Sequence, residues 1–333
     1  MIRKGIYMKI RNILQFFADP NTQTTGTSSL SAENKTFYEK ELIEEASPEL
    51  VHDQFGDDYP IPKNGGKQIE FRKYDSLKPA NTPLTEGVTP DGNSLSVSTV
   101  TSTVKQYGDY ITISDVLDLT AIDNNVVQAS KVLGAQAGLT LDNVTRDVMA
   151  GGTNVLIVGD RATRAQLTAA DTLTPEIFFR AAAMLEAMNA PKIQKSYVAI
   201  IHPYAAYDLM RSEEWIDVHK YAAPEAIFEG EIGKIGNVRF VSTSNAKIWK
   251  GTGCPADTAV FGTLVLGAHA YAKTGIDGGA LQMIIKPAGA GEDPLNQRST
   301  VGWKAIKTAE RLIEQYMIRI ESTSKFSGSV EAN

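Results

Sequence analysis

The stretch that decides the fold runs from Leu95 to Ile113 and reads LSVSTVTSTVKQYGDYITI. Its residues alternate with a period of two, as in a β-strand. Small hydroxyl groups and single β-branched side chains dominate both faces, which favours strands but leaves too little apolar area on either face for a core. We expect a ribbon that packs against another surface, supplied by the same chain or by a neighbouring copy.

The residues before this stretch complete a hairpin. Turn-forming residues fill 57–66, a short strand is expected over 69–74, and a polar loop rich in Pro, Gly and Thr follows over 78–92. A two-stranded hairpin of this kind is only marginally stable when isolated. The sequence therefore predicts that 51–113 forms one long β-hairpin that contributes no core.

The first 32 residues also lack a core of their own. Residues 19–32 contain a single bulky apolar side chain, Leu30, and such a stretch cannot offset the entropy lost on ordering. Before it lies a short apolar patch made of Ile13, Leu14, Phe16 and Phe17. A signal peptide would need a longer apolar core after its basic start, so secretion is not expected. We predict an arm over 1–32 that is ordered only against something else.

Helical periodicity marks two segments around the hairpin. A first helix is expected over 33–46, before Ser47-Pro48. A second is expected over 125–149, closed by Gly151-Gly152 and roughly 40 Å long. Its apolar or small residues recur at spacings of three and four, as Val126, Ser130, Leu133, Ala137, Leu141, Val144 and Val148.

The second half of the chain mixes helices and strands. Thr174-Pro175 predicts the start of a helix, with Thr174 as its N-cap. The apolar run 197–201 predicts a buried strand that ends at His202-Pro203, before another helix. Further strands are expected over 236–242, 259–261 and 264–266. The fold class that follows is α+β, with mostly antiparallel pairing.

The end of the chain leaves two interpretations open. Residues 298–310 and 312–320 both alternate with a period of two, which is compatible with two long paired strands. The second of these segments is also compatible with a helix.

Composition excludes several classes of protein. Lys plus Arg number 33 against 39 Asp plus Glu, for a net charge of −6, so the chain is not a uniformly basic nucleic-acid binder. The longest strongly apolar stretch, 264–272, is far shorter than a membrane helix requires, so we expect no membrane association. A single cysteine, Cys254, excludes an intrachain disulfide, and four scattered histidines exclude a Cys/His zinc cage.

No motif assembles a catalytic, cofactor or metal site. Gly66-Lys67 lacks the remaining residues of a phosphate-binding loop, and the glycines of 230–236 stand in the wrong order for a dinucleotide fingerprint. His219 has acidic neighbours, but an exposed acidic helix end explains them better than a metal site. His202 is a candidate general base, with the nearby residues Ser196, Tyr204 and Asp208. A histidine at the end of a strand is more often structural, so an α+β hydrolase using His202 is a distant alternative. We assign no catalytic residue and no cofactor, and expect no enzyme. An arm, a hairpin and a long helix that each need a partner surface favour assembly instead.

The order of these pieces resembles the major capsid proteins of tailed phages of the Hong Kong 97 type, and within them the subfamily named after phage N-four. The most specific stretch of the resemblance runs from Thr82-Pro83-Leu84-Thr85-Glu86-Gly87 through Gln106-Tyr107-Gly108-Asp109-Tyr110 to Ser114-Asp115. Leu14-Gln15-Phe16-Phe17-Ala18, before the Thr-rich tract, is similar to the opening of that subfamily. The segments 199–203 and 236–241 resemble the axial domain of the family, and the last 35 residues resemble its peripheral-domain strands.

The resemblance implies a role for each piece of the chain. The expected units are an N-terminal arm over 1–32, an arm-proximal helix over 33–50, an extended loop over 51–113, a peripheral domain with a spine helix over 114–171, an axial domain over 172–265, and peripheral return strands with the C-terminus over 266–333. Subunit contacts are expected in the extended loop at Pro79, Leu84, Thr85, Glu86, Gly87 and Val88. In the arm they are expected at Ile13, Leu14, Phe16 and Phe17.

The resemblance also implies the partners and location of the protein. Copies of the chain would form pentamers and hexamers of an icosahedral phage head in the virion, after synthesis in the cytoplasm of the host bacterium. Portal, scaffolding and decoration proteins are the other expected partners. Double-stranded DNA would be contacted weakly and non-specifically, as the acidic balance suggests.

Two departures from the founding phage and one alternative complete the expectations. The chain has no room for a large scaffolding segment before the arm, and neither Lys78 nor Asn296 matches a crosslinking motif. An encapsulin-like bacterial compartment, which would enclose enzymes in place of DNA, is the alternative with the same fold.

Overall fold

The computed structural model of this chain describes residues 42, 50–74, 77, 79–84, 86–89, 92–120, 125–212, 215, 231–289, 293 and 295–333. The predicted arm over 1–32 lies outside these residues, as does the predicted helix over 33–46 apart from Leu42. Leu42 is helical and fully buried. None of the helices in the described ranges is long and apolar enough to cross a membrane.

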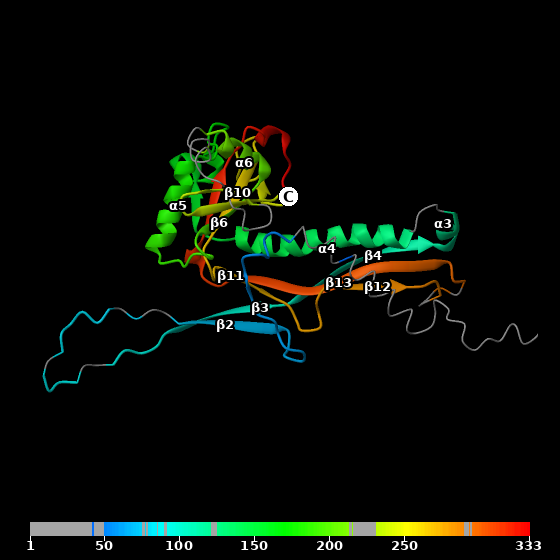
Figure 1. The fold of residues 1–333 in the computed structure, drawn as a ribbon, viewed down its shortest axis with the longest axis horizontal. Helices are drawn as coiled ribbons and strands as arrows, with labels where there is room; N and C mark the ends of the chain where they lie inside the picture. The colour runs from blue at the N-terminus through cyan, green and yellow to red at the C-terminus, as the bar shows by residue number, and fades with distance from the viewer. Residues whose placement is uncertain are drawn as a thin grey trace, which may run out of the picture.

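A five-stranded sheet forms the lower part of the molecule in Figure 1. Its strands are β1 (Asp57–Asp58), β4 (Lys105–Ser114), β11 (Tyr271–Thr274), β12 (Gln282–Lys286) and β13 (Arg298–Arg311). β13 is the central strand and pairs antiparallel with β4, β11 and β12, whereas β1 adds to β11 in parallel. Gly108 of β4 faces β13 closely, because a Cβ atom there would lie 2.5 Å from the Trp303 carbonyl oxygen.

The long helix α4 (Asn125–Ala150) runs along this sheet (Figure 1). The predicted stripe accounts for this packing, because residues at spacings of three and four fall on one face of a helix. Four of its seven residues are buried, and Val126, Val144 and Val148 are partly buried. Leu133, Ala137 and Leu141 of that stripe share a core with Val301 and Trp303 of β13. A short exposed helix, α3 (Asp115–Thr120), precedes α4. The prediction of a helix over 125–149 is confirmed to within one residue.

A seven-stranded sheet forms a second core. Its strands are β5 (Val155–Ile157), β6 (Tyr197–Ile201), β7 (Glu231–Ile235), β8 (Val238–Ser242), β9 (Ile248–Trp249), β10 (Val260–Leu266) and β14 (Met317–Ser322). The strand order is β5-β14-β10-β6-β8-β7, with β9 also paired to β10. Two helices accompany the sheet, α5 (Pro175–Ala187) and α6 (Pro203–Met210) (Figure 1).

The sequence-based elements of this region agree with the structure in most respects. The strand predicted over 197–201 is β6, and all five of its residues are buried. Helix α5 begins at Pro175, as predicted, but the Thr174 side chain makes no capping hydrogen bond. Short 3-10 turns complete the described elements, namely η3 (Val158–Asp160), η4 (Arg164–Gln166), η5 (Glu314–Tyr316) and η6 (Ser327–Ser329).

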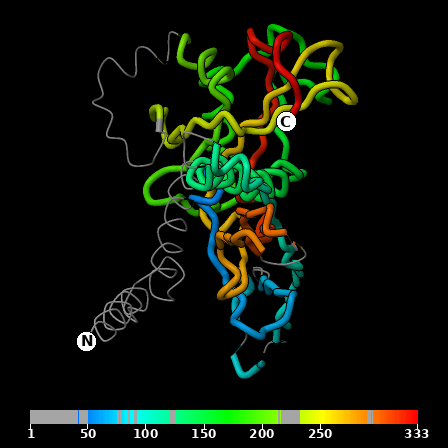
Figure 2. The backbone as a smooth tube through the Cα atoms, turned by 90° about the vertical axis from the view of Figure 1, so that its right-hand side faces the viewer, coloured from blue at the N-terminus to red at the C-terminus, as the bar shows by residue number. Residues whose placement is uncertain are grey.

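Helix α4 also joins the two sheets. Figure 2 shows it end-on between them. At its C-terminal end, Met149 packs in a third core with residues of β6, β8 and β10 and with Phe55 and Tyr271. The Arg319 guanidinium of β14 donates hydrogen bonds to the carbonyls of Ala150 and Gly152, which lack partners inside the helix. The two sheets are therefore held through the same helix end.

The hairpin is made of β2 (Gln68–Tyr74) and β3 (Val97–Thr103), which pair antiparallel over seven residues each. It reaches far beyond both sheets (Figure 1). The structure corrects the prediction that 51–113 is one hairpin. The alternating stretch is broken at Val104, which is buried, and the residues after it become β4 of the five-stranded sheet. The reason is that β4 finds a long partner in β13, whereas β3 pairs only with β2.

The end of the chain is the second correction. β13 and β14 are not paired with each other, because η5 lies between them and β14 enters the other sheet between β5 and β10. The helix interpretation of 312–320 is also wrong, since the segment contains the short 3-10 turn η5 and then the first four residues of β14. Met317 to Ser322 therefore belong to the seven-stranded sheet, although the resemblance implied that all of 266–333 belongs to the peripheral domain.

Candidate subunit-interface surfaces

The tip of the hairpin makes almost no contact with its own chain. Leu84 is 77% exposed, Leu95 70% and Val88 62%. Of the six loop residues expected at a subunit contact, Pro79, Leu84, Glu86, Gly87 and Val88 are all exposed, and Thr85 lies outside the described residues. Fully burying a Leu or Val side chain is worth roughly 1.5–3 kcal/mol, so this tip leaves apolar burial unused within the subunit.

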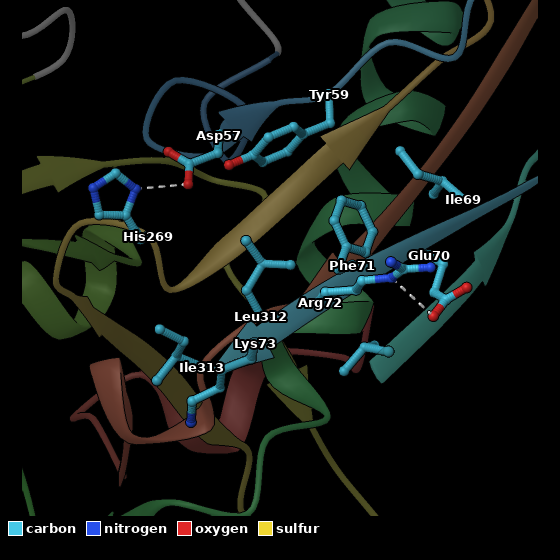
Figure 3. A pocket seen from close by; sticks show the side chains of 11 residues that line it. Asp57, Tyr59, Ile69, Glu70, Phe71, Arg72, Lys73, His269, Leu312 and Ile313 are labelled. Carbon is cyan, nitrogen blue, oxygen red and sulfur yellow. Dashed lines mark hydrogen bonds and ion pairs between the residues drawn. The ribbon is translucent and has the colours of Figure 1, made fainter. Parts of the chain in front are cut away.

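A cavity opens at the other end of the hairpin, where β2 passes the start of β11. Its volume is about 350 Å³. Apolar walls come from Tyr59, Ile69, Phe71, Val100, Leu312 and Ile313. Figure 3 shows Phe71 standing between Ile69 and Leu312. The rings of Tyr59 and Phe71 meet edge to face at 5.5 Å, which fixes the upper wall.

The charged side chains of this cavity are paired with one exception. His269 Nδ1 and Asp57 Oδ2 lie 2.7 Å apart, and Arg72 Nε donates to Glu70 Oε1 at 3.4 Å. Lys73 also lines the cavity, and its ammonium forms no ion pair within the described part of the chain. The cavity therefore combines apolar walls with charged side chains of both signs.

A buried polar network lies where the segment that leads into the hairpin meets α4. His52 and Asp142 are both fully buried, with His52 Nδ1 and Asp142 Oδ2 2.7 Å apart. The backbone N–H of His52 donates to Asp142 Oδ1 at 2.8 Å, and Asn245 Nδ2 donates to Asp142 Oδ2 at 2.7 Å. Burial alone would raise the pKa of Asp142, but the charge and hydrogen bonds of His52, together with Asn245, hold it below its usual value.

A second ion pair sits beside this network. Lys307 of β13 donates to Asp53 and to the carbonyl of Leu141. Burial lowers the pKa of Lys307, and the nearby Asp53 carboxylate opposes that shift. The network therefore ties α4, β13 and the approach to the hairpin to the loop that carries Asn245. No local motif signals it, because His52 and Asp142 are 90 residues apart in sequence.

The remaining sequence candidates fall elsewhere. The arm residues Ile13, Leu14, Phe16 and Phe17 lie outside the described residues. His202 is buried and caps α6, with its Nδ1 accepting from the Tyr204 N–H at 3.2 Å. Burial lowers the pKa of His202 to about 4.

The partners proposed for His202 are used by other groups. Asp208 accepts the backbone N–H of Lys325, and Ser196 accepts Arg239 Nε. Among the described residues, the recorded hydrogen bond of the His202 ring is the one it accepts from the Tyr204 backbone N–H. Among the described residues no cluster of three or more His, Cys, Asp or Glu could hold a metal ion.

Comparison with known proteins identifies the fold. No protein-family model and no curated protein matches the sequence. Among solved structures, the capsid of Ralstonia phage GP4 has a TM-score of 0.65 and 17% identity, covering 82% of this chain and 86% of that chain. The capsid of the cyanophage P-SCSP1u has a TM-score of 0.61 and 18% identity, covering 80% of this chain and 85% of that chain.

A virus-like particle from Pyrococcus furiosus is also similar, with a TM-score of 0.50 and 10% identity over 86% of this chain and 99% of that chain. These likenesses define the class of fold. The chain has the α+β Hong Kong 97-type capsid fold, as the sequence resemblance implied. Membership in the subfamily named after phage N-four stays a prediction.

Proposed function

We propose that this protein is the major capsid protein of a tailed phage, a structural subunit that self-assembles into the head around double-stranded DNA. The observation that carries the proposal is the hairpin. It extends beyond the body of a phage-capsid fold with its apolar tip exposed (Figure 1). The exposed tip adds nothing to the core of its own copy, whereas a neighbouring copy can bury it.

Many modest contacts suit a shell. Apolar burial contributes about 25 cal/mol per Å² before the cost of association is subtracted, so one ribbon alone gives limited affinity. Contacts between different patches of identical copies close into rings, and rings of two sizes close a shell. Pentamers and hexamers of this chain are the rings that we propose.

The finer parts of the proposal follow the resemblance. The arm over 1–32 lies along a neighbouring subunit, 51–113 carries the extended loop, 114–171 holds the spine helix, and 172–265 forms the axial domain. Scaffolding, portal and decoration proteins are the proposed partners in the virion, and synthesis takes place in the host bacterial cytoplasm. The net charge of −6 favours weak contact with packaged DNA, because an acidic wall does not trap the genome.

Electron microscopy and sedimentation of the purified full-length chain test the proposal. We expect closed particles, or rings that sediment well above the monomer. A chain that stays monomeric at high concentration and forms no particles contradicts the proposal. Strong, salt-sensitive binding of free DNA by isolated subunits would contradict the part that concerns the genome.

The contents of the particles separate a phage head from a bacterial compartment. Particles that carry DNA and a portal support the phage, and particles that carry a cargo enzyme support an encapsulin-like compartment. The phage assignment is favoured because phage capsids are among the solved structures that this chain resembles, with TM-scores of 0.61 and 0.65.

A further inference from the structure

We propose that the buried network of His52, Asp142 and Asn245 sets the direction in which the hairpin leaves the subunit relative to the seven-stranded sheet, and through it the curvature of the shell. The inference rests on the proposed assembly of the chain into a shell. It makes Asp142 a positioning residue, because its carboxylate is shared by the segment that leads into the hairpin and by a loop of the seven-stranded sheet.

The Asp142 carboxylate lies where these two parts of the subunit meet. On one side, His52 Nδ1 lies 2.7 Å from Asp142 Oδ2 and the His52 backbone N–H donates to Oδ1 at 2.8 Å, so the segment that leads into the hairpin is held at two points. On the other side, Asn245 Nδ2 donates to the same Oδ2 at 2.7 Å. Asn245 lies in the loop between β8 and β9 of the seven-stranded sheet. One side chain of α4 therefore connects the hairpin to that sheet.

The Asn245 side chain is also held at its other end. Arg146, one helical turn after Asp142, donates from Nη1 to Asn245 Oδ1 at 2.8 Å and to the Asn245 carbonyl at 3.1 Å. Asp142, Arg146 and Asn245 are all buried, so water does not offer replacement partners. The Asn245 amide therefore cannot rotate without losing hydrogen bonds at both ends.

A role in orientation explains this network better than a role in stability. Hydrogen bonds weaken steeply away from their preferred distance and angle, whereas the apolar contacts of Phe55 and Met149 nearby have no preferred direction. His52 Nε2 is buried and has no hydrogen-bond partner within the described part of the chain. An unpaired buried polar atom costs stability, so stability alone does not favour a histidine here. Buried polar groups can instead be retained because they specify one arrangement.

The hairpin enlarges any change in this direction. It reaches far beyond both sheets (Figure 1), so a small rotation at His52 moves the tip by a larger distance. Contacts between different patches of identical copies close into a ring only at one rotation between neighbours. A network that holds the hairpin loosely should therefore give particles of mixed size.

An exchange of the acid and the amide tests the role of Asp142. Asp142→Asn places an N–H group opposite the Asn245 amide, and Asn245→Asp places a second carboxylate opposite Asp142. The double variant restores a donor opposite an acceptor, because the amide introduced at position 142 has one N–H group for His52 Nδ1 and one for the carboxylate introduced at position 245. That carboxylate can still accept from Arg146.

Distances between spin labels on unassembled full-length subunits report the direction of the hairpin. In a Cys254→Ser background, Thr99→Cys in β3 and Ala183→Cys in α5 are exposed labelling positions. The chain with an intact network should give one narrow distance distribution. Each single exchange should raise the population outside it by roughly tenfold, and the double variant should return it toward the starting value.

Val301→Ala is the control for lost stability. Val301 is buried in the apolar core of α4 and β13 and is not part of the network. This variant should unfold at a lower denaturant concentration and keep the narrow distribution. Single exchanges that stay narrow, a double variant no narrower than they are, or equal broadening in Val301→Ala overturn the inference. If Asp142→Asn does not fold, Asn245→Ala removes only the bond to the sheet loop and should broaden the distribution in the same way.

Electron microscopy of the same variants tests the effect on curvature. Particles of each single exchange should vary in diameter, and those of the double variant and of Val301→Ala should be as uniform as wild type. Uniform particles from the single exchanges overturn the link to curvature and leave the proposed function standing. An absence of particles from the wild-type chain contradicts the proposed function, whereas the label distances test the network without assembly.

Discussion

Strands β3 and β10 are both seven residues long, yet they lie in opposite environments. β10 has the sequence VFGTLVL and is buried at every position, between β14 and β6. β3 has the sequence VSTVTST, pairs only with β2, and is exposed at five of its seven positions. The difference shows that side-chain size and the number of paired neighbours together decide whether a strand is buried. Large apolar side chains with neighbours on both sides build the core of the subunit, and small hydroxyl side chains with one neighbouring strand build a ribbon that its own chain leaves exposed.

The strongest way to sharpen this comparison is to remove a large side chain from the seven-stranded sheet. Phe240 of β8 is fully buried and its ring centroid lies 4.7 Å from that of Phe178 and 5.4 Å from that of Trp215. We expect Phe240→Ala to lower the free energy of unfolding by about 3–5 kcal/mol, measured by chemical denaturation of unassembled subunits. The matched change Val97→Ala in β3 should cost less than about 0.5 kcal/mol. Equal losses at the two positions would contradict the comparison.

The second prediction concerns the pH dependence of subunit stability, which His202 beside the seven-stranded sheet should control. His202 is buried against Phe261 and Tyr204, and burial lowers its pKa from 6.5 to about 4. Below pH 6.5 the His202 imidazole becomes protonated in the unfolded chain, whereas in the folded chain it stays neutral until the pH approaches 4. Stability is therefore complete above pH 6.5 and falls as the pH drops toward 4, by about 3 kcal/mol in total.

His202→Asn keeps a capping acceptor at the start of α6 but cannot titrate. The variant should lose that part of the pH dependence when unfolding is measured at pH 7 and pH 4.5. A slope equal to that of wild type would show that His202 takes up its proton equally in the folded and unfolded chain, which contradicts the lowered pKa.

Removing a charge from the buried polar network of His52, Asp142 and Asn245 should lower the free energy of unfolding by an intermediate amount. Asp142→Asn removes the charge that His52 and Asn245 hold, and we expect a loss of about 1–3 kcal/mol at pH 7 by urea denaturation. Asp147→Asn is the control on the same helix, since its ion pairs with Arg146 and Lys247 are partly exposed and should contribute less than about 1 kcal/mol. Because the pKa of Asp142 is lowered, its contribution is present above pH 3.8 and is lost as the pH falls below that value.

The smallest effect on subunit stability is expected at the hairpin tip. Deletion of residues 79–92 should change the free energy of unfolding by no more than about 0.5 kcal/mol, because the described residues of this loop are exposed and contribute to no core. The same deletion should weaken shell closure, as seen by electron microscopy. Loss of subunit folding instead would place the loop inside the core and break the comparison with β10.

Local signals predicted the elements well and their partners less well. The stripe from Val126 to Val148 predicted α4, and the apolar run 197–201 predicted β6, because side-chain periodicity depends only on neighbours in the chain. The continuous alternation through Val104 hid the change from β3 to β4. β3 and β4 follow each other with the same two-residue period, and they differ in their partners, since β3 pairs with β2 and β4 pairs with β13.

The candidate sites show the same limit. The polar loop over 78–92 was predicted from composition, since a loop of small and polar residues cannot form a core, and its described residues are exposed. The subunit contacts expected within it came from the family resemblance and stay a prediction. The cavity was not predicted, because its walls come from β1, β2, β3, the turn before β11 and the turn at Leu312. The His52–Asp142 pair was also missed, since no spacing rule connects residues so far apart.

The sequence by itself determined the period of each segment, and with it the long helix, the buried strands and a ribbon too poor in apolar area to stand alone. Only the tertiary structure decided that β13 and β14 enter different sheets and that His52 meets Asp142. It also decided that a cavity opens at the base of the hairpin. The physical reason is that periodicity is written into neighbouring residues, whereas pairing depends on which distant surfaces compete most successfully for the same strand.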